Sequence, residues 1–151
     1  MRLFTAAIPP PDVLDKLAVA LDGTDHTDWV PRDSWHITLG YYGEDDPATR
    51  VPWVRERMQG LVAPKVSLTD AGNFGNTLWI GVSRVDPAFN ALGAALRFND
   101  RHDWHPHLTI GHGDPLDLPY SSPEWTIGEV VLLGADRRYE YTVVDRFGFA
   151  V

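Results

Sequence analysis

The sequence contains no cysteine, no long apolar run and no excess of positive charge. The absence of Cys among 151 residues excludes disulfides, thiolate nucleophiles and Cys-based zinc sites, and it fits a reducing compartment. No apolar run reaches the roughly 20 residues that a membrane span needs, and residues 1–8 carry no signal-peptide pattern. The sequence therefore predicts a soluble, cytoplasmic protein without a membrane partner.

The balance of charges limits how the chain can bind nucleic acid. With 21 acidic residues against 13 Lys and Arg, the formal net charge is −8. Extended nucleic-acid binding depends on many cations that neutralise phosphates, so we expect none here. A short RNA end or a cyclic nucleotide remains compatible, because a focused pocket need not follow the net charge.

One short pattern occurs twice: HITLG begins at His36, and HLTIG begins at His107, 71 positions later. Alternate residues on a strand share a face, so His36 would lie beside Thr38, and His107 beside Thr109. The apolar residues between them would face the core. If the two strands face each other, two imidazoles and two hydroxyls converge on one space.

The hydrophobic pattern of the whole chain alternates between the strand and helix periods, and each motif follows a helix and a loop. This predicts an α+β fold of two similar lobes in a single domain, residues 1–151, and we expect a monomer. Helices are expected over residues 9–23, 47–61 and 86–98. Besides the two motif strands, strands are expected over 3–8, 64–71, 77–83, 126–133 and 139–151.

Paired imidazoles and hydroxyls suit the cleavage of a phosphodiester. A base must remove the proton of the attacking oxygen, and an acid must protonate the leaving oxygen. Because the unperturbed pKa of His is about 6.5, one neutral and one charged imidazole can coexist near neutral pH. Fixed hydroxyl donors can stabilise the charge that grows on the phosphate oxygens. This chemistry requires no metal and no cofactor.

Four segments, MRLFTAAIPP, WVPRDSWHITLGYYG, GNFGNTLWIGV and WHPHLTIG, resemble the 2H phosphoesterase superfamily in order and spacing. The resemblance is to its 2′-5′ RNA ligase-like, or RNA 2′,3′-cyclic phosphodiesterase, branch, whose signature is two H-x-[T/S]-x motifs. It implies two pseudo-symmetric lobes around a central cleft and the opening of 2′,3′-cyclic phosphates to 2′-phosphates. It also implies that His107 activates water, His36 protonates the leaving oxygen, and Thr38 and Thr109 hold the phosphate.

Two positions after the motifs are candidate substrate-binding residues. Many relatives have an arginine five residues after the second histidine, where this chain has His112, which lacks the fixed charge and bidentate geometry of arginine. At the equivalent place after the first motif, relatives often have Phe and this chain has Tyr41. The Tyr41 ring could stack on a base or pack in the core.

Two alternatives compete with a phosphodiesterase. A metal site could use His102, His105, His107 and His112, but strand parity places His112 on the opposite face of a straight strand from His107, so tetrahedral convergence is not natural. The other alternative is a non-catalytic nucleotide-binding module of the same fold. A binder would not need both proton-transfer groups, so the intact motifs favour the enzyme. The residues Trp29, Trp35, Trp79 and Trp104 are interpreted as packing aromatics.

Overall fold

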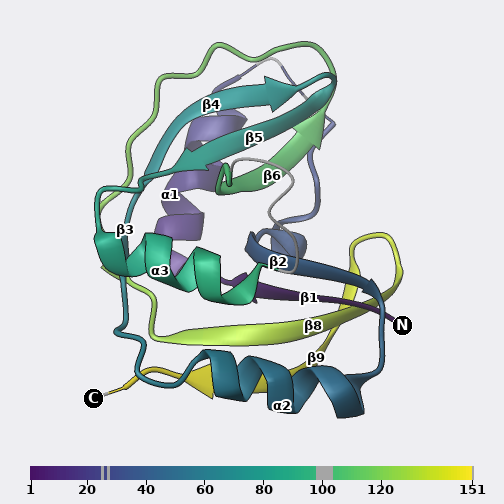
Figure 1. Ribbon diagram of the computed structural model, residues 1–151. Helices are drawn as coiled ribbons and strands as arrows, with labels where there is room; N and C mark the ends of the chain where they lie inside the picture. Colours follow the sequence, from purple (N-terminus) through teal and green to yellow (C-terminus); the bar gives the residue numbers. More distant parts are fainter. Residues whose placement is uncertain (25, 27, 98–103, 151) are drawn as a thin grey trace.

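The computed structural model of the protein describes residues 1–24, 26, 28–97 and 104–150 (Figure 1). Three α-helices are present in these ranges: α1 (Pro11–Asp22), α2 (Pro47–Arg57) and α3 (Pro87–Leu96), with a single 3₁₀ turn at Arg32–Ser34. The strands are β1 (Arg2–Ala7), β2 (Ile37–Glu44), β3 (Lys65–Val66), β4 (Leu68–Phe74), β5 (Thr77–Val82), β6 (His107–His112), β7 (Trp125–Thr126), β8 (Glu129–Arg137) and β9 (Glu140–Gly148).

Seven of the strands form one antiparallel sheet in the order β4-β5-β6-β2-β1-β8-β9. The contact between β6 and β2 is narrow, because it consists of the single pair Ile37 and Leu108. This narrow contact divides the sheet into an upper half, β4-β5-β6, and a lower half, β2-β1-β8-β9 (Figure 1). The prediction of an α+β fold with two lobes is confirmed.

The first residues of each helix explain where it begins. Asp46 caps α2 by accepting a hydrogen bond from the Ala48 amide at 2.9 Å, and Asp86 caps α3 in the same way through Ala88 at 2.9 Å. All three helices have proline at the first position, where the missing N–H is not needed. The three predicted helices are therefore confirmed: α2 begins at the expected residue, and the other ends lie one to four residues inside the expected limits.

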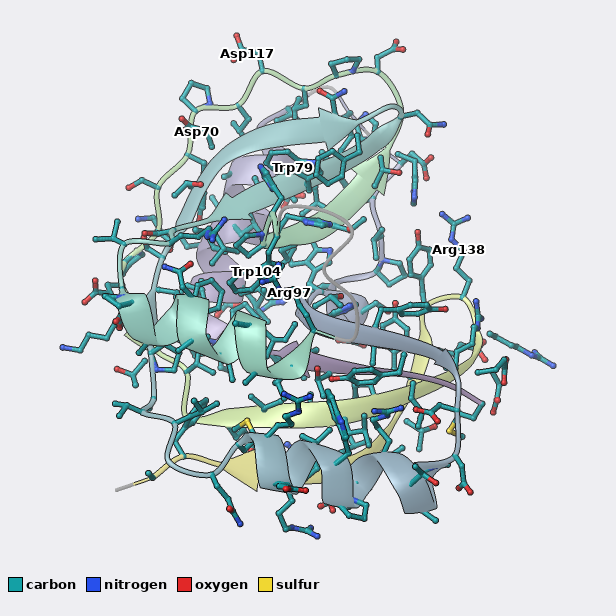
Figure 2. All side chains as sticks on the ribbon, viewed as in Figure 1. Asp70, Trp79, Arg97, Trp104, Asp117 and Arg138 are labelled. Atoms are coloured by element: carbon teal, nitrogen blue, oxygen red, sulfur yellow. The ribbon has the colours of Figure 1, made fainter. Side chains whose placement is uncertain are left out.

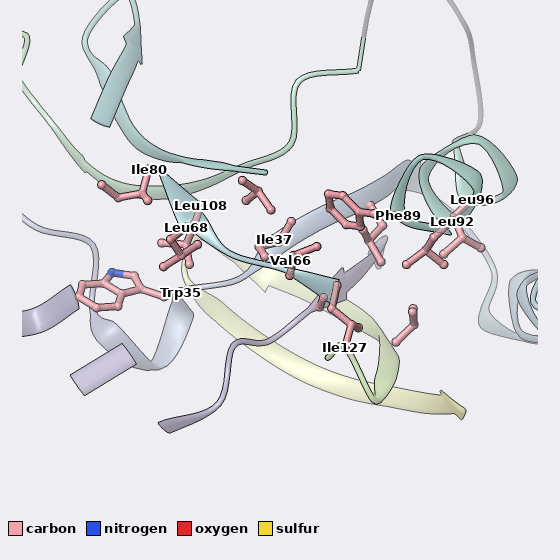
Figure 3. Close-up of a cluster of buried hydrophobic side chains, with 14 of the residues drawn as sticks. Trp35, Ile37, Val66, Leu68, Ile80, Phe89, Leu92, Leu96, Leu108 and Ile127 are labelled. Atoms are coloured by element: carbon pink, nitrogen blue, oxygen red, sulfur yellow. The ribbon is translucent and has the colours of Figure 1, made fainter. Parts of the chain in front are cut away.

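The core lies on one face of the sheet, where all three helices pack. It includes Val13 of α1, Val54 of α2 and Phe89 of α3. Figure 3 shows Phe89 together with Ile37 and Leu108 from the two motifs. A second, smaller cluster lies on the other face and contains no helical residue: Phe4, Ala6, Val131, Leu133 and Ala135, with Tyr141 packed against it. The helix-free face is the one that carries the candidate site. None of the described helices has the length and apolar character needed to span a membrane.

Seven strands were expected, and the large sheet contains seven, but several strands begin or end at other residues than expected. The expected strands 64–71 and 77–83 left residues 72–76 between them, yet β4 continues to Phe74 and the turn is confined to Gly75 and Asn76. Gly75 has φ +57°, which favours glycine. The strand expected over 126–133 is divided into β7, which pairs with β3, and β8, which continues to Arg137. The last two strands are therefore joined by a tight hairpin at Arg138 and Tyr139.

Candidate active site

The pair Ile37 and Leu108 brings the two motifs together. Each of these residues directly follows the histidine of its motif, and both side chains are fully buried in the core. In an antiparallel pair the neighbouring positions run in opposite directions, so position 36 lies next to 109 and position 38 next to 107. The four polar side chains therefore share the face opposite the core. The predicted juxtaposition of two histidines and two threonines is present in the structure.

The two imidazoles are held by the same kind of hydrogen bond. The Nδ1 atom of His36 lies 2.7 Å from the carbonyl oxygen of Ser34, and the Nδ1 atom of His107 lies 2.6 Å from that of His105. A carbonyl only accepts, so in each ring Nδ1 carries the proton and the neutral ring keeps its lone pair on Nε2. The Nε2 atom of His36 lies 3.0 Å from the Oγ1 of Thr38. Both rings thus present Nε2 as their reactive atom.

The surroundings of both histidines favour the neutral form. Burial lowers the pKa of His36, and the nearby His107 lowers it further, although the bond to Ser34 acts in the opposite direction. Burial also lowers the pKa of His107, opposed by its bond to the His105 carbonyl. The repulsion between the two rings means that protonation of one disfavours protonation of the other. The pair can therefore hold one proton more easily than two.

Aromatic rings flank each histidine, and the sequence did not identify them as site residues. Phe4 and Tyr141 lie 5.0 and 5.2 Å from the His36 ring. Phe74 and Trp79 lie 5.2 and 6.0 Å from the His107 ring. Trp79 was interpreted as a packing aromatic, but it is half-buried beside the site and its Nε1 has no hydrogen-bond partner among the described residues. Phe74 was missed because it lies between the expected strands 64–71 and 77–83.

A bulge follows each motif and changes which residues face the site. On β2, Thr38 pairs with Ala6 and Tyr41 pairs with Phe4, so one extra residue lies between the two pairs. Ala6 and Phe4 share a face of β1, and Thr38 and Tyr41 therefore share it too, despite their odd spacing. The Tyr41 side chain is 58% exposed, so it is not a core residue.

The second bulge places His112 on the site face. On β6, Thr109 pairs with Trp79 and His112 pairs with Thr77, which again leaves one extra residue. Because Trp79 and Thr77 share a face of β5, His112 lies on the same face as Thr109. The prediction that His112 lies on the opposite face was wrong, because it assumed a straight strand.

The glycines of the two motifs allow close packing at these bulges. A Cβ atom at Gly40 would lie 2.1 Å from the carbonyl oxygen of Leu96 in α3. A Cβ atom at Gly111 would lie 2.5 Å from the carbonyl oxygen of Asp28. Such distances leave no room for a side chain. Close packing therefore explains why glycine occupies the last position of the repeated H-x-T-x-G pattern.

The hairpin between β8 and β9 connects the two motifs. The Nε2 atom of His112 lies 2.7 Å from a terminal guanidinium nitrogen of Arg138 and 3.2 Å from the Tyr139 hydroxyl. Figure 2 shows the Arg138 side chain extending from this hairpin. On the other side, the Ser34 hydroxyl donates to the Tyr139 carbonyl at 2.8 Å, and the Ser34 carbonyl is the acceptor for His36. The hairpin tip therefore touches the His36 loop and the end of β6.

The predicted residues thus fall into two groups. His36, Thr38, His107 and Thr109 meet around the narrow strand contact, and Tyr41 and His112 share their face through the bulges. The histidine cluster considered for a metal includes His102, which lies outside the described residues. His105 is exposed, and its ring centre lies 6.2 Å from that of His107.

Comparison with known proteins finds a match to one family model and similarity to several solved structures. A model of the 2′-5′ RNA ligase superfamily matches residues 10–138. The structure of Escherichia coli LigT complexed with NADP⁺ aligns with a TM-score of 0.82 at 20% identity, over 99% of this chain and 98% of that chain. TT0787 of Thermus thermophilus aligns with a TM-score of 0.79 at 21% identity, over 99% and 98%. A structure named only as a phosphoesterase aligns with a TM-score of 0.79 at 21% identity, over 99% of both chains. No curated protein matches the sequence.

Proposed function

The chain belongs to the 2′-5′ RNA ligase superfamily, and from this premise we propose that it is a metal-independent phosphodiesterase that opens 2′,3′-cyclic phosphates to 2′-phosphates. The family supports phosphoester chemistry in general, and the finer assignment rests on the site. The substrate class is a short RNA end or a cyclic nucleotide. The observation that carries the proposal is the convergence of two His–Thr pairs whose reactive nitrogens are both Nε2.

The reaction needs one proton acceptor and one proton donor, and the paired imidazoles supply both. In the proposed mechanism His107 Nε2 takes a proton from water as the water oxygen forms a bond to phosphorus. The bond from phosphorus to the 3′ oxygen breaks, and His36 Nε2 gives its proton to that oxygen. The product carries a 2′-phosphate and a free 3′ hydroxyl. Exchange with solvent then returns the proton to His36 and removes it from His107.

The threonines have a separate role in this mechanism. The Thr38 hydroxyl, which lies 3.0 Å from His36 Nε2, donates to that nitrogen in the neutral ring and can turn to a phosphate oxygen when substrate binds. Thr109 faces the same space from the other strand. Donors aimed at the non-bridging oxygens stabilise the charge that grows there during attack. No step requires a metal ion.

The test is a panel of 2′,3′-cyclic mononucleotides and oligonucleotides ending in a 2′,3′-cyclic phosphate. We expect turnover to 2′-phosphates, identified by phosphorus NMR, and loss of turnover in His36→Ala and His107→Ala. Formation of a 3′-phosphate would contradict the proposed direction of opening. Binding of the panel without turnover would replace the enzyme by a nucleotide-binding module.

A further inference from the structure

A small cavity beside the histidines is lined by cations and aromatic rings. It has a volume of about 150 Å³, and its lining residues are Arg2, Phe4, Tyr41, Ala135, Arg137, Arg138, Tyr139 and Tyr141. Two of these, Phe4 and Tyr141, are the rings that flank His36. The cavity is therefore next to the first catalytic motif, on the same helix-free face of the sheet.

The sheet register explains why these residues come together. Four neighbouring strands, β2, β1, β8 and β9, each contribute side chains to one face. Tyr41 pairs with Phe4, and Ala135 pairs with both Arg2 and Tyr141, so these five residues point the same way. Arg138 and Tyr139 complete the cavity from the hairpin tip. The bulge after the first motif is needed for this arrangement, because it turns Tyr41 to this face.

The cavity is cationic in a protein that is acidic overall. Three of the 13 basic residues line it, and no Asp or Glu occurs among the described residues that do so. Glu44 pairs with Arg2 in the sheet, but its carboxylate is engaged by the N-terminal amine at 2.8 Å. Among the residues that the structure describes, three arginines and no carboxylate line this small cavity, so an anion there is electrostatically favourable. Arginine is also well suited to phosphate, because its planar donors match phosphate oxygens.

The hairpin tip is held in a strained shape that presents Arg138. Tyr139 has φ +62°, in the left-handed region that a bulky side chain rarely adopts. A backbone in this region is unfavourable for tyrosine and persists where surrounding contacts fix it. Here the Ser34 hydroxyl holds the Tyr139 carbonyl, and the Tyr139 ring lies 4.8 Å from the Arg138 guanidinium. His112 accepts a hydrogen bond from the same guanidinium at 2.7 Å.

We infer that this cavity binds a second phosphate group of the substrate, separate from the cyclic phosphate on which the histidines act. The inference rests on the proposed function and narrows its substrate class. The preferred substrate carries a phosphate at the 5′ position of the terminal nucleotide. This phosphate is either a free monoester or the diester that links the nucleotide to the rest of an RNA end. Arg137 and Arg138 are its specificity-determining ligands.

The inference is tested by a ratio of rates. kcat/KM is measured for adenosine 2′,3′-cyclic phosphate, for the same nucleotide with a 5′-phosphate, and for a dinucleotide with a cyclic phosphate end. We expect the wild type to prefer the two longer substrates by about tenfold or more, as one charge-assisted hydrogen bond can provide. In Arg138→Ala and Arg137→Ala the ratio should fall towards one. A preference for only one of the two substrates identifies the monoester or the diester as the ligand.

A matched control separates charge at the cavity from charge elsewhere. Arg146 lies on β9 outside the cavity, in an ion pair with Glu129 at 2.5 Å, and Arg146→Ala should keep the wild-type ratio. A merely structural role of Arg138 would lower all three rates together and leave the ratio unchanged. That result, or a wild type without preference, overturns the inference while leaving the proposed function intact.

A binding measurement covers the case in which no substrate is turned over. Calorimetry compares adenosine 2′,5′-bisphosphate with adenosine 2′-monophosphate. We expect tighter binding of the bisphosphate, lost in Arg138→Ala and weakened by salt. With this result and no turnover, the proposed function fails and the second-phosphate site stands. Equal affinity of the two nucleotides would reject the site.

Discussion

The Nδ1 atom of His36 lies 2.7 Å from the Ser34 carbonyl oxygen, and this relationship repeats between His107 and His105 at 2.6 Å. Both histidines are thereby fixed in the tautomer that leaves Nε2 available. The repetition arises because each carbonyl belongs to the residue two positions before its histidine. In each half of the sheet, the backbone directly before the motif therefore orients the histidine of that motif. The two halves thus contribute equivalent parts to one site.

The first prediction concerns pH. Burial lowers the pKa of both histidines below the usual 6.5. In the free enzyme the protonated ring that the reaction needs therefore loses its proton at a pH below 6.5. We expect a bell-shaped kcat/KM whose basic limb lies below about pH 6.5. The charge of bound phosphate stabilises imidazolium, so the basic limb of kcat should lie at higher pH. Coincident limbs for kcat and kcat/KM would contradict this.

The second prediction separates the roles of the two histidines. His36→Ala and His107→Ala should each lower kcat/KM by about 10²-fold or more, and the double variant should lose little beyond the worse single variant. An activated aryl phosphodiester has a leaving group that needs no proton, so it should rescue His36→Ala and not His107→Ala. Rescue of His107→Ala instead would exchange the assigned roles.

The third prediction concerns the support of Arg138. His112→Gln keeps an oxygen acceptor near the guanidinium, whereas His112→Leu has a similar size and no acceptor. We expect His112→Gln to retain more of the preference for 5′-phosphorylated substrates than His112→Leu does. The ratios of kcat/KM measure this, and thermal midpoints check that both variants fold. Equal ratios would show that His112 does not hold Arg138.

The fourth prediction concerns stability. Gly111→Ala would place a Cβ atom 2.5 Å from the Asp28 carbonyl oxygen, so we expect a loss of about 1 to 3 kcal/mol in the free energy of unfolding. Gly128→Ala is the matched control, because its Cβ atom meets nothing within 4 Å. Denaturant unfolding of both variants measures the difference. A Gly111→Ala variant as stable as the control would reject the packing reason for the motif glycine.

The fifth prediction is that activity survives chelation. Because imidazoles and hydroxyls supply every group in the proposed mechanism, turnover should be unchanged after dialysis against EDTA. Activity is compared before and after dialysis, and again after zinc or manganese is added. Loss on chelation with recovery on metal addition would favour a metal site instead.

The sequence was sufficient for the parts of the site that depend on local pattern. Alternation along a strand correctly placed His36 with Thr38, because those residues precede the bulge. The same rule failed for His112, because the bulge adds one residue to the strand. Residues beyond the bulge therefore point to the opposite face from the one that simple alternation predicts. Nothing in the apolar pattern distinguishes a bulged strand from a straight one. The glycine at the end of each motif is the signal that could have indicated the bulge.

The hairpin residues were missed for a different reason. The strand was expected to end at Leu133, but Gly134 lies within β8, at a point where a Cβ atom would meet the Met1 side chain at 2.2 Å. The strand therefore continues to Arg137, and the turn falls at Arg138 and Tyr139. Their partners, Ser34 and His112, are distant in the chain. Contacts of this kind depend on the assembled sheet and leave no local pattern.

The position of β1 between β2 and β8 has a consequence for how the chain acquires its site during synthesis. The strand that begins at Arg2 pairs with β8, whose residues are translated after both motifs. A nascent chain that ends before Glu129 already contains both complete motifs. It still lacks the strand that closes the lower half of the sheet and the hairpin that meets Ser34. Both motifs can thus be translated well before the site is assembled. Pairing between strands that are distant in the chain also slows folding.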